Sequence, residues 1–69
     1  MVEVFSTNVV EQAHADRLVA LLHTHFPGGK INFDLQDCDH ILRIEKQQLA
    51  SEKVIQVLHE QGYQCCILE

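Results

Sequence analysis

The sequence predicts a single small α+β domain with the element order βαββαβ. Two segments carry apolar residues at helical spacing, and four short segments are rich in strand-forming residues or alternate apolar with polar ones. A Pro-Gly-Gly turn follows the first helical segment and a single glycine follows the second, so each helix has a clear end. The sequence has no repeat or low-complexity segment. Its length of 69 residues leads us to expect that residues 1–69 form one domain, near the lower size limit for independent folding.

The first two elements are a strand over residues 2–6 and a helix that starts between Val9 and Gln12. The strand is short, and either of its faces can be the buried one. Asn8 is predicted to cap the helix, because Glu11 three residues later completes a capping-box pattern. An apolar stripe with a period of 3.6 residues then runs along the helix. Its members are Ala15, Leu18, Val19, Leu22 and Phe26.

A β-hairpin is predicted after the first helix. Residues 30–35 alternate between apolar and polar side chains, residues 36–39 form a polar connection, and residues 40–45 are the return strand. The predicted core residues of this hairpin are Ile31, Phe33, Leu35, Leu42 and Ile44.

Ser51 is predicted to cap the second helix, and Glu52 is favourably placed in the first turn of that helix. Gly62 ends this helix, and residues 63–68 form the last strand. The buried stripe of the second helix is Val54, Val57 and Leu58, with Ile55 beside it. Two amphipathic helices and four strands pack most simply as a ferredoxin-like sandwich, with a four-stranded antiparallel sheet and both helices on one face.

Charge and composition narrow the functional classes. Ten acidic against five basic residues give a net charge of −5, which argues against a nucleic-acid partner and against an anionic membrane surface. No apolar run approaches the ~20 residues of a membrane span. No serine or cysteine has a histidine and an acid arranged around it, and no glycine-rich phosphate loop is present. We therefore expect a binding module and not an enzyme.

The three cysteines indicate a reducing compartment. Cys65 and Cys66 are adjacent, Cys38 stands alone, and none forms a CxxC. A secreted domain would use paired, spaced cysteines, so we expect free thiols and a cytoplasmic location. Neighbouring strand residues point to opposite faces, so one of the adjacent pair is expected in the core and the other at the surface. An exposed thiol is a minor alternative for redox chemistry or soft-metal binding.

Three segments resemble the heavy-metal-associated domain family of copper chaperones and metal-transport ATPase modules. They are Thr7–Val9 before the first helix, Asp39–Ile44 in the third strand, and Leu58–Tyr63 with its Gly-Tyr entry to the last strand. The resemblance covers nearly the whole chain. It implies a ferredoxin-like fold, a role in metal binding or trafficking, and a metal-transporting ATPase or other protein as partner.

The family's metal site is a CxxC at the first loop and helix start, and here Glu11 and His14 stand at those two positions. The loss of both thiolates argues against Cu(I), which soft thiolates select. A carboxylate and an imidazole suit a divalent ion such as Zn²⁺, and residues three apart are neighbours on a helix. Glu11 and His14 are therefore the predicted metal ligands, with a third ligand or a second chain completing the site.

A competing interpretation is a degenerate family member that has lost metal binding. Glu11 would then be only a capping residue, and His14 a polar residue on the helix flank. Such a module would meet a protein partner through its acidic surface or an unpaired sheet edge. The sequence pattern leaves the oligomeric state open. The other histidines, His23, His25, His40 and His59, are expected to be solvent-facing or partly buried.

Overall fold

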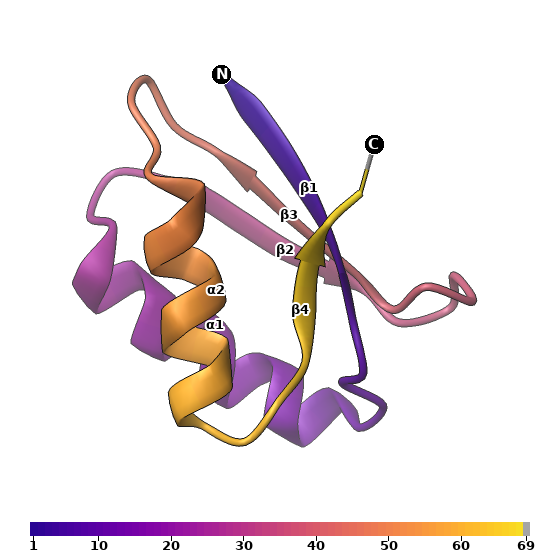
Figure 1. The fold of residues 1–69 in the computed structure, drawn as a ribbon. Helices are drawn as coiled ribbons and strands as arrows, with labels where there is room; N and C mark the ends of the chain where they lie inside the picture. The colour runs from indigo at the N-terminus through magenta and orange to yellow at the C-terminus, as the bar shows by residue number, and fades with distance from the viewer. Residues whose placement is uncertain (69) are drawn as a thin grey trace.

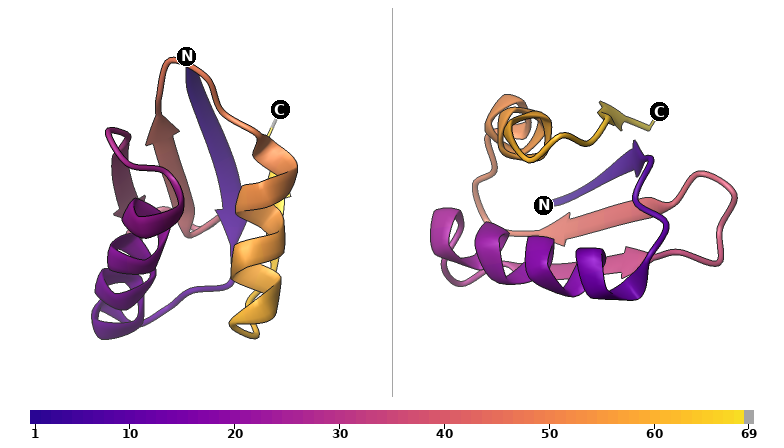
Figure 2. Two further views of the ribbon diagram at one scale, coloured as in Figure 1. Left: turned by 90° about the vertical axis from the view of Figure 1, so that its left-hand side faces the viewer. Right: turned by 90° about the horizontal axis from the view of Figure 1, so that it is seen from below.

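The computed structural model describes residues 1–68 and contains the six predicted elements. They are β1 (Val2–Thr7), α1 (Gln12–His25), β2 (Lys30–Asp34), β3 (Ile41–Glu45), α2 (Ser51–Glu60) and β4 (Cys65–Ile67) (Figure 1). The strand order is β2-β3-β1-β4, and every neighbouring pair is antiparallel. Both helices lie on the same side of the sheet (Figure 2). The predicted α+β ferredoxin-like sandwich is thereby confirmed.

The strand β1 lies in the interior of the sheet, between β3 and β4. Phe5 is 0% exposed, so the face of β1 that carries Phe5 is the one that packs under the helices. Glu3 shares this face, and its Oε1 accepts a hydrogen bond of 2.8 Å from the Ser51 hydroxyl at the start of α2. The structure thus identifies the buried face of β1, which the sequence pattern left undecided.

The core lies between the sheet and the two helices and contains the predicted apolar stripes. Its main cluster consists of Phe5, Leu22, Phe26, Ile31, Leu42, Ile44, Val54, Val57, Leu58 and Cys65. A second cluster joins Val9, in the connection between β1 and α1, to Ala15 and Leu18 of α1. The apolar periodicity of both helices therefore predicted their buried faces correctly.

The predicted capping box of α1 is wrong. The helix begins at Gln12 with Glu11 in the N-cap position, and no side chain caps it. The side chain of Asn8 instead accepts a 2.8 Å hydrogen bond from the backbone N–H of Gln64, next to β4. Val9 is 0% exposed, and its insertion into the core leaves Asn8 outside the helix. A tertiary contact thus replaces the local cap.

Ser51 is also not the cap of its helix. It is the first residue of α2, the N-cap position belongs to Ala50, and the Ser51 hydroxyl bonds to Glu3. The glycine prediction holds: Gly62, with φ of +91°, follows the C-cap residue Gln61. Gly28, with φ of +84°, makes the turn that follows α1.

The bounds of all four strands differ from the predicted ones by one or two residues, and β1 extends to Thr7. β2 ends at Asp34, so Leu35 belongs to the turn. β3 starts after His40, whose φ of +46° is incompatible with a strand. β4 is shorter than predicted, because the N–H groups of Tyr63 and Gln64 bond to Leu58 and Asn8 and not to β1. Within residues 1–68, neither helix is long and apolar enough to cross a bilayer.

Candidate functional site

The predicted metal ligands lie at the corner where β1 passes into α1. Two neighbouring segments hold the backbone of this corner. The N–H of Thr7 donates to the carbonyl oxygen of Asp39 in the β2–β3 connection at 3.0 Å, and Asn8 accepts from Gln64 at 2.8 Å. Val9 is fully buried between these contacts. The main chain that leads into Glu11 is therefore fixed by tertiary structure.

Glu11 and His14 converge, as the spacing predicts. The Oε2 atom of Glu11 and the Nε2 atom of His14 are 3.3 Å apart. Their side chains are 68% and 38% exposed, respectively, so an ion from solvent can reach both. A divalent ion between these two atoms would meet one carboxylate oxygen and one imidazole nitrogen, which are donors that Zn²⁺ accepts.

An aromatic neighbour that the sequence did not reveal flanks His14. The rings of His14 and Tyr63 are 6.1 Å apart between centroids and inclined at 57°. Tyr63 is half-buried and also packs on the small cluster that contains Val9. Its contact with His14 limits the orientations of the imidazole. Residues so far apart in the chain carry no local signal of such a contact.

The electrostatics of the corner are mixed. The free N–H groups at the start of α1 favour negative charge, which suits the Glu11 carboxylate but opposes a cation. Among residues 1–68, no third Asp, Glu, His or Cys lies close enough to join Glu11 and His14 as a ligand. The pair therefore supplies two ligands, and water or a partner's side chain must supply the others.

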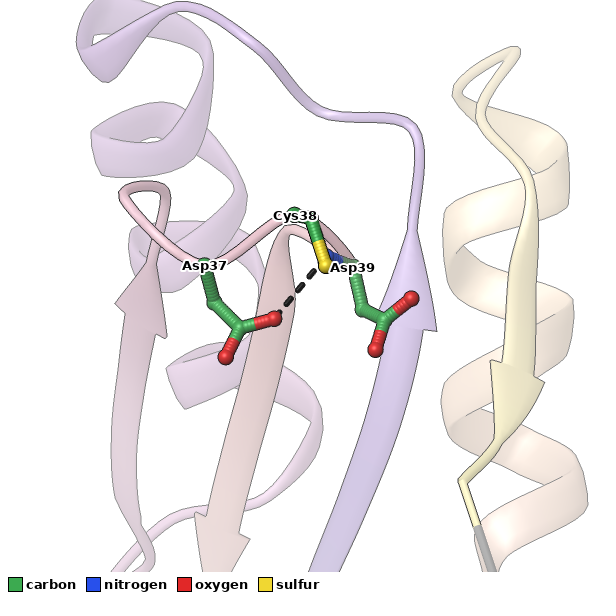
Figure 3. Close-up of side chains that lie close together, drawn as sticks. All are labelled: Asp37, Cys38 and Asp39. Carbon is green, nitrogen blue, oxygen red and sulfur yellow. Dashed lines mark hydrogen bonds between the residues drawn. The ribbon is translucent and has the colours of Figure 1, made fainter.

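A second group of potential ligands lies in the β2–β3 connection. Asp37, Cys38 and Asp39 place one ligand atom each within 4.8 Å of one another (Figure 3). The N–H of Asp39 donates to Oδ1 of Asp37 at 2.9 Å, which forms a local turn. From its sequence, this run is predicted to be a polar connection only. Exposed acidic groups of this kind are common in proteins that bind no ion. A metal titration should therefore monitor these three residues separately from Glu11 and His14.

The cysteines divide as predicted. Cys65 is 2% exposed and faces the core, whereas Cys66 and Cys38 are exposed. Burial, together with the neighbouring Cys66, raises the pKa of the Cys65 thiol to about 12. Cys65 is therefore a neutral core residue and offers no thiolate. His23, His25 and His59 are exposed and His40 is partly buried, as expected.

No family model matches the chain, and no curated protein and no solved structure is significantly similar to it. The likeness to the heavy-metal-associated domain therefore stays a prediction from the residues that carry it.

Proposed function

We propose that this chain is a small module that binds a divalent metal ion such as Zn²⁺ through Glu11 and His14. The observation that supports this most directly is the 3.3 Å separation of the two ligand atoms at an accessible corner. The fold adds support, because this corner is where the resembled family carries its metal. The role is one of binding and not of catalysis.

The open coordination of the pair suits transfer of an ion better than storage. Two protein ligands leave a four-coordinate ion with free positions, and structural zinc sites fill all four. A partner that supplies a third and fourth ligand would take over the ion by stepwise ligand exchange. By the family resemblance, we propose a metal-transporting ATPase or another trafficking protein as this partner.

The test is an NMR amide titration of the reduced protein with Zn²⁺, and separately with Cu(I). We expect saturable shifts around Glu11 and His14 with Zn²⁺ and none there with Cu(I). The Glu11→Ala/His14→Ala variant should lose the Zn²⁺ shifts, since it lacks both ligands. Spectra of the metal-free variant check that the fold is intact.

A matched control removes the same two residue types elsewhere. His59 and Glu60 are exposed on α2, and adjacent helix residues do not face each other. His59→Ala/Glu60→Ala should bind Zn²⁺ like the wild type. Equal binding by the Glu11/His14 variant would refute the proposed site. Zn²⁺ shifts centred on residues 37–39 would instead place the metal site in the β2–β3 connection.

The second candidate is a protein-interaction or regulatory module without metal, the degenerate form of the same family. The observation that favours it is the sheet itself: within residues 1–68, the strand order leaves one edge of β2 and one edge of β4 without a neighbouring strand. Absence of saturable Zn²⁺ shifts in the wild type would favour this role.

A further inference from the structure

The strand β2 is the longer of the two edge strands and is flanked by a groove. It spans Lys30–Asp34, whereas β4 spans only Cys65–Ile67. The groove has a volume of about 270 Å³ and lies between α1 and β2. Its lining residues are Gln12, Ala15, Asp16, Val19, Ile31, Asn32 and Phe33. Val19 and Phe33 are only partly buried, so apolar surface is accessible beside an unpaired strand edge.

The hydrogen-bonding direction of β2 follows from the register. The backbone N–H of Lys46, the residue after β3, donates to the carbonyl oxygen of Met1, which is the next pair in the β1–β3 register. Backbone hydrogen bonds alternate in direction along a strand, so the even-numbered residues of β3 form theirs with β1 and the odd-numbered residues form theirs with β2. The register pairs those odd-numbered residues with even-numbered residues of β2, as in Lys30 with Glu45. The N–H and C=O groups of Ile31 and Phe33 therefore point to the open edge.

The side chains of β2 match a second copy of the same strand. In an antiparallel pair centred on Asn32, Ile31 lies opposite Phe33 of the other copy, and each such pair exchanges two backbone hydrogen bonds. In the same register Lys30 lies opposite Asp34 of the other copy, and the reverse pair repeats the contact. Lys30 and Asp34 are both exposed on the face away from the helices.

Other arrangements of two β2 edges lose these contacts. A parallel in-register pair places Lys30 beside Lys30 and Asp34 beside Asp34, and like charges directly opposite are destabilising. A shift by two residues in either direction breaks both charge pairs and leaves fewer backbone bonds. Charges on an edge strand usually prevent sheet-to-sheet association, but here they select one register.

From this complementarity we propose that two copies of this chain associate through β2, forming a two-fold symmetric dimer with a continuous eight-stranded sheet. The symmetry is isologous, because the same edge serves both copies. The groove beside α1 becomes part of the interface, so the second copy covers Val19 and Phe33, which line it. This inference rests on the sheet edge alone and is independent of metal binding at Glu11 and His14.

Two charge reversals test the dimer. Lys30→Glu places two acids opposite each other, and Asp34→Lys places two lysines opposite each other. By sedimentation equilibrium, each variant alone should dimerise at least about tenfold more weakly than the wild type. An equimolar mixture of the two variants should form a heterodimer. In that heterodimer the introduced glutamate lies opposite the introduced lysine, and the unchanged Asp34 of one copy lies opposite the unchanged Lys30 of the other.

Lys53→Glu is the matched control, since it makes the same charge change on α2 and should leave the dimer intact. Hydrogen exchange gives a second readout: in the wild type, the amides of Ile31 and Phe33 should become slower to exchange as the protein concentration rises. NMR spectra of each variant confirm folding. A wild type that stays monomeric up to its solubility limit, or a dimer that neither reversal weakens, would overturn the proposal.

Discussion

At the scale of single residues, the adjacent cysteines show how alternation along a strand gives neighbouring side chains opposite properties. Cys65 faces the core, and Cys66 faces solvent. Burial keeps the Cys65 thiol neutral, with its pKa raised to about 12. Only the thiolate is an effective nucleophile, so the chemistry of the two sulfur atoms must differ although they are one residue apart.

Alkylation of the native protein is expected to modify Cys38 and Cys66 rapidly and Cys65 only after unfolding. Mass spectrometry of the peptides, with and without denaturant, measures the three rates. The denatured sample is the control, in which all three thiols should react alike. Rapid modification of Cys65 in the native state would show that this strand opens easily.

The same thiol makes stability depend on alkaline pH. Its folded-state pKa of about 12 lies above the ordinary value of 9.0, so between these values the folded state holds a proton that the unfolded state loses. The contribution of the Cys65 thiol to the free energy of unfolding is therefore fully present below pH 9.0 and is lost as the pH rises towards about 12. In this range, the free energy of unfolding should fall by up to about 1.4 kcal/mol per pH unit. Urea unfolding of the wild type and of Cys65→Ala across this range checks it.

At the scale of elements, both helices begin without a side-chain cap of their own. Each start is fixed by a contact with a distant strand or loop. The Ser51 hydroxyl at the start of α2 bonds to Glu3 in β1, and Asn8 near the start of α1 bonds to Gln64 before β4. The helix starts therefore depend on the assembled sheet.

Ser51→Ala is expected to lower the free energy of unfolding by about 1 kcal/mol, the usual net value of one hydrogen bond. The loss should disappear when Glu3 is already replaced by alanine, because the partner of the hydroxyl is then absent. Chemical denaturation of the four variants gives this double-mutant cycle. Ser6→Ala, on the outer face of β1, is the control. Equal losses in both backgrounds would mean that Ser51 acts through the local helix start.

At the scale of the whole molecule, stability depends mainly on the larger cluster of buried side chains between the sheet and the two helices. A domain of this size has about 3–10 kcal/mol of stability in total. Leu58 is 0% exposed, on the inner face of α2. Leu58→Ala is expected to cost about 2–5 kcal/mol and to leave much of the protein unfolded at 37 °C. Val10→Ala, at a site 67% exposed, should change little. Thermal unfolding by circular dichroism compares the two.

The fold was predictable because its evidence is local. Apolar periodicity identified both buried helix faces, and Gly62 marked a helix end correctly. The helix caps were predicted wrongly because Asn8 and Ser51 have distant partners that no local pattern reveals. For the candidate site, the spacing of Glu11 and His14 predicted their convergence. The contact with Tyr63 and the grouping of ligands in the β2–β3 connection required the tertiary structure.

The place of β1 in the sheet has a consequence for biosynthesis. This strand leaves the ribosome before the other three, yet its partners β3 and β4 end only at residues 45 and 67. The backbone groups of β1 and the side chain of Phe5 therefore lack their partners in the sheet and the core while most of the domain is translated. We expect compact structure to appear on the ribosome only after almost the whole domain has emerged. A nascent chain arrested before β4 should then remain sensitive to protease.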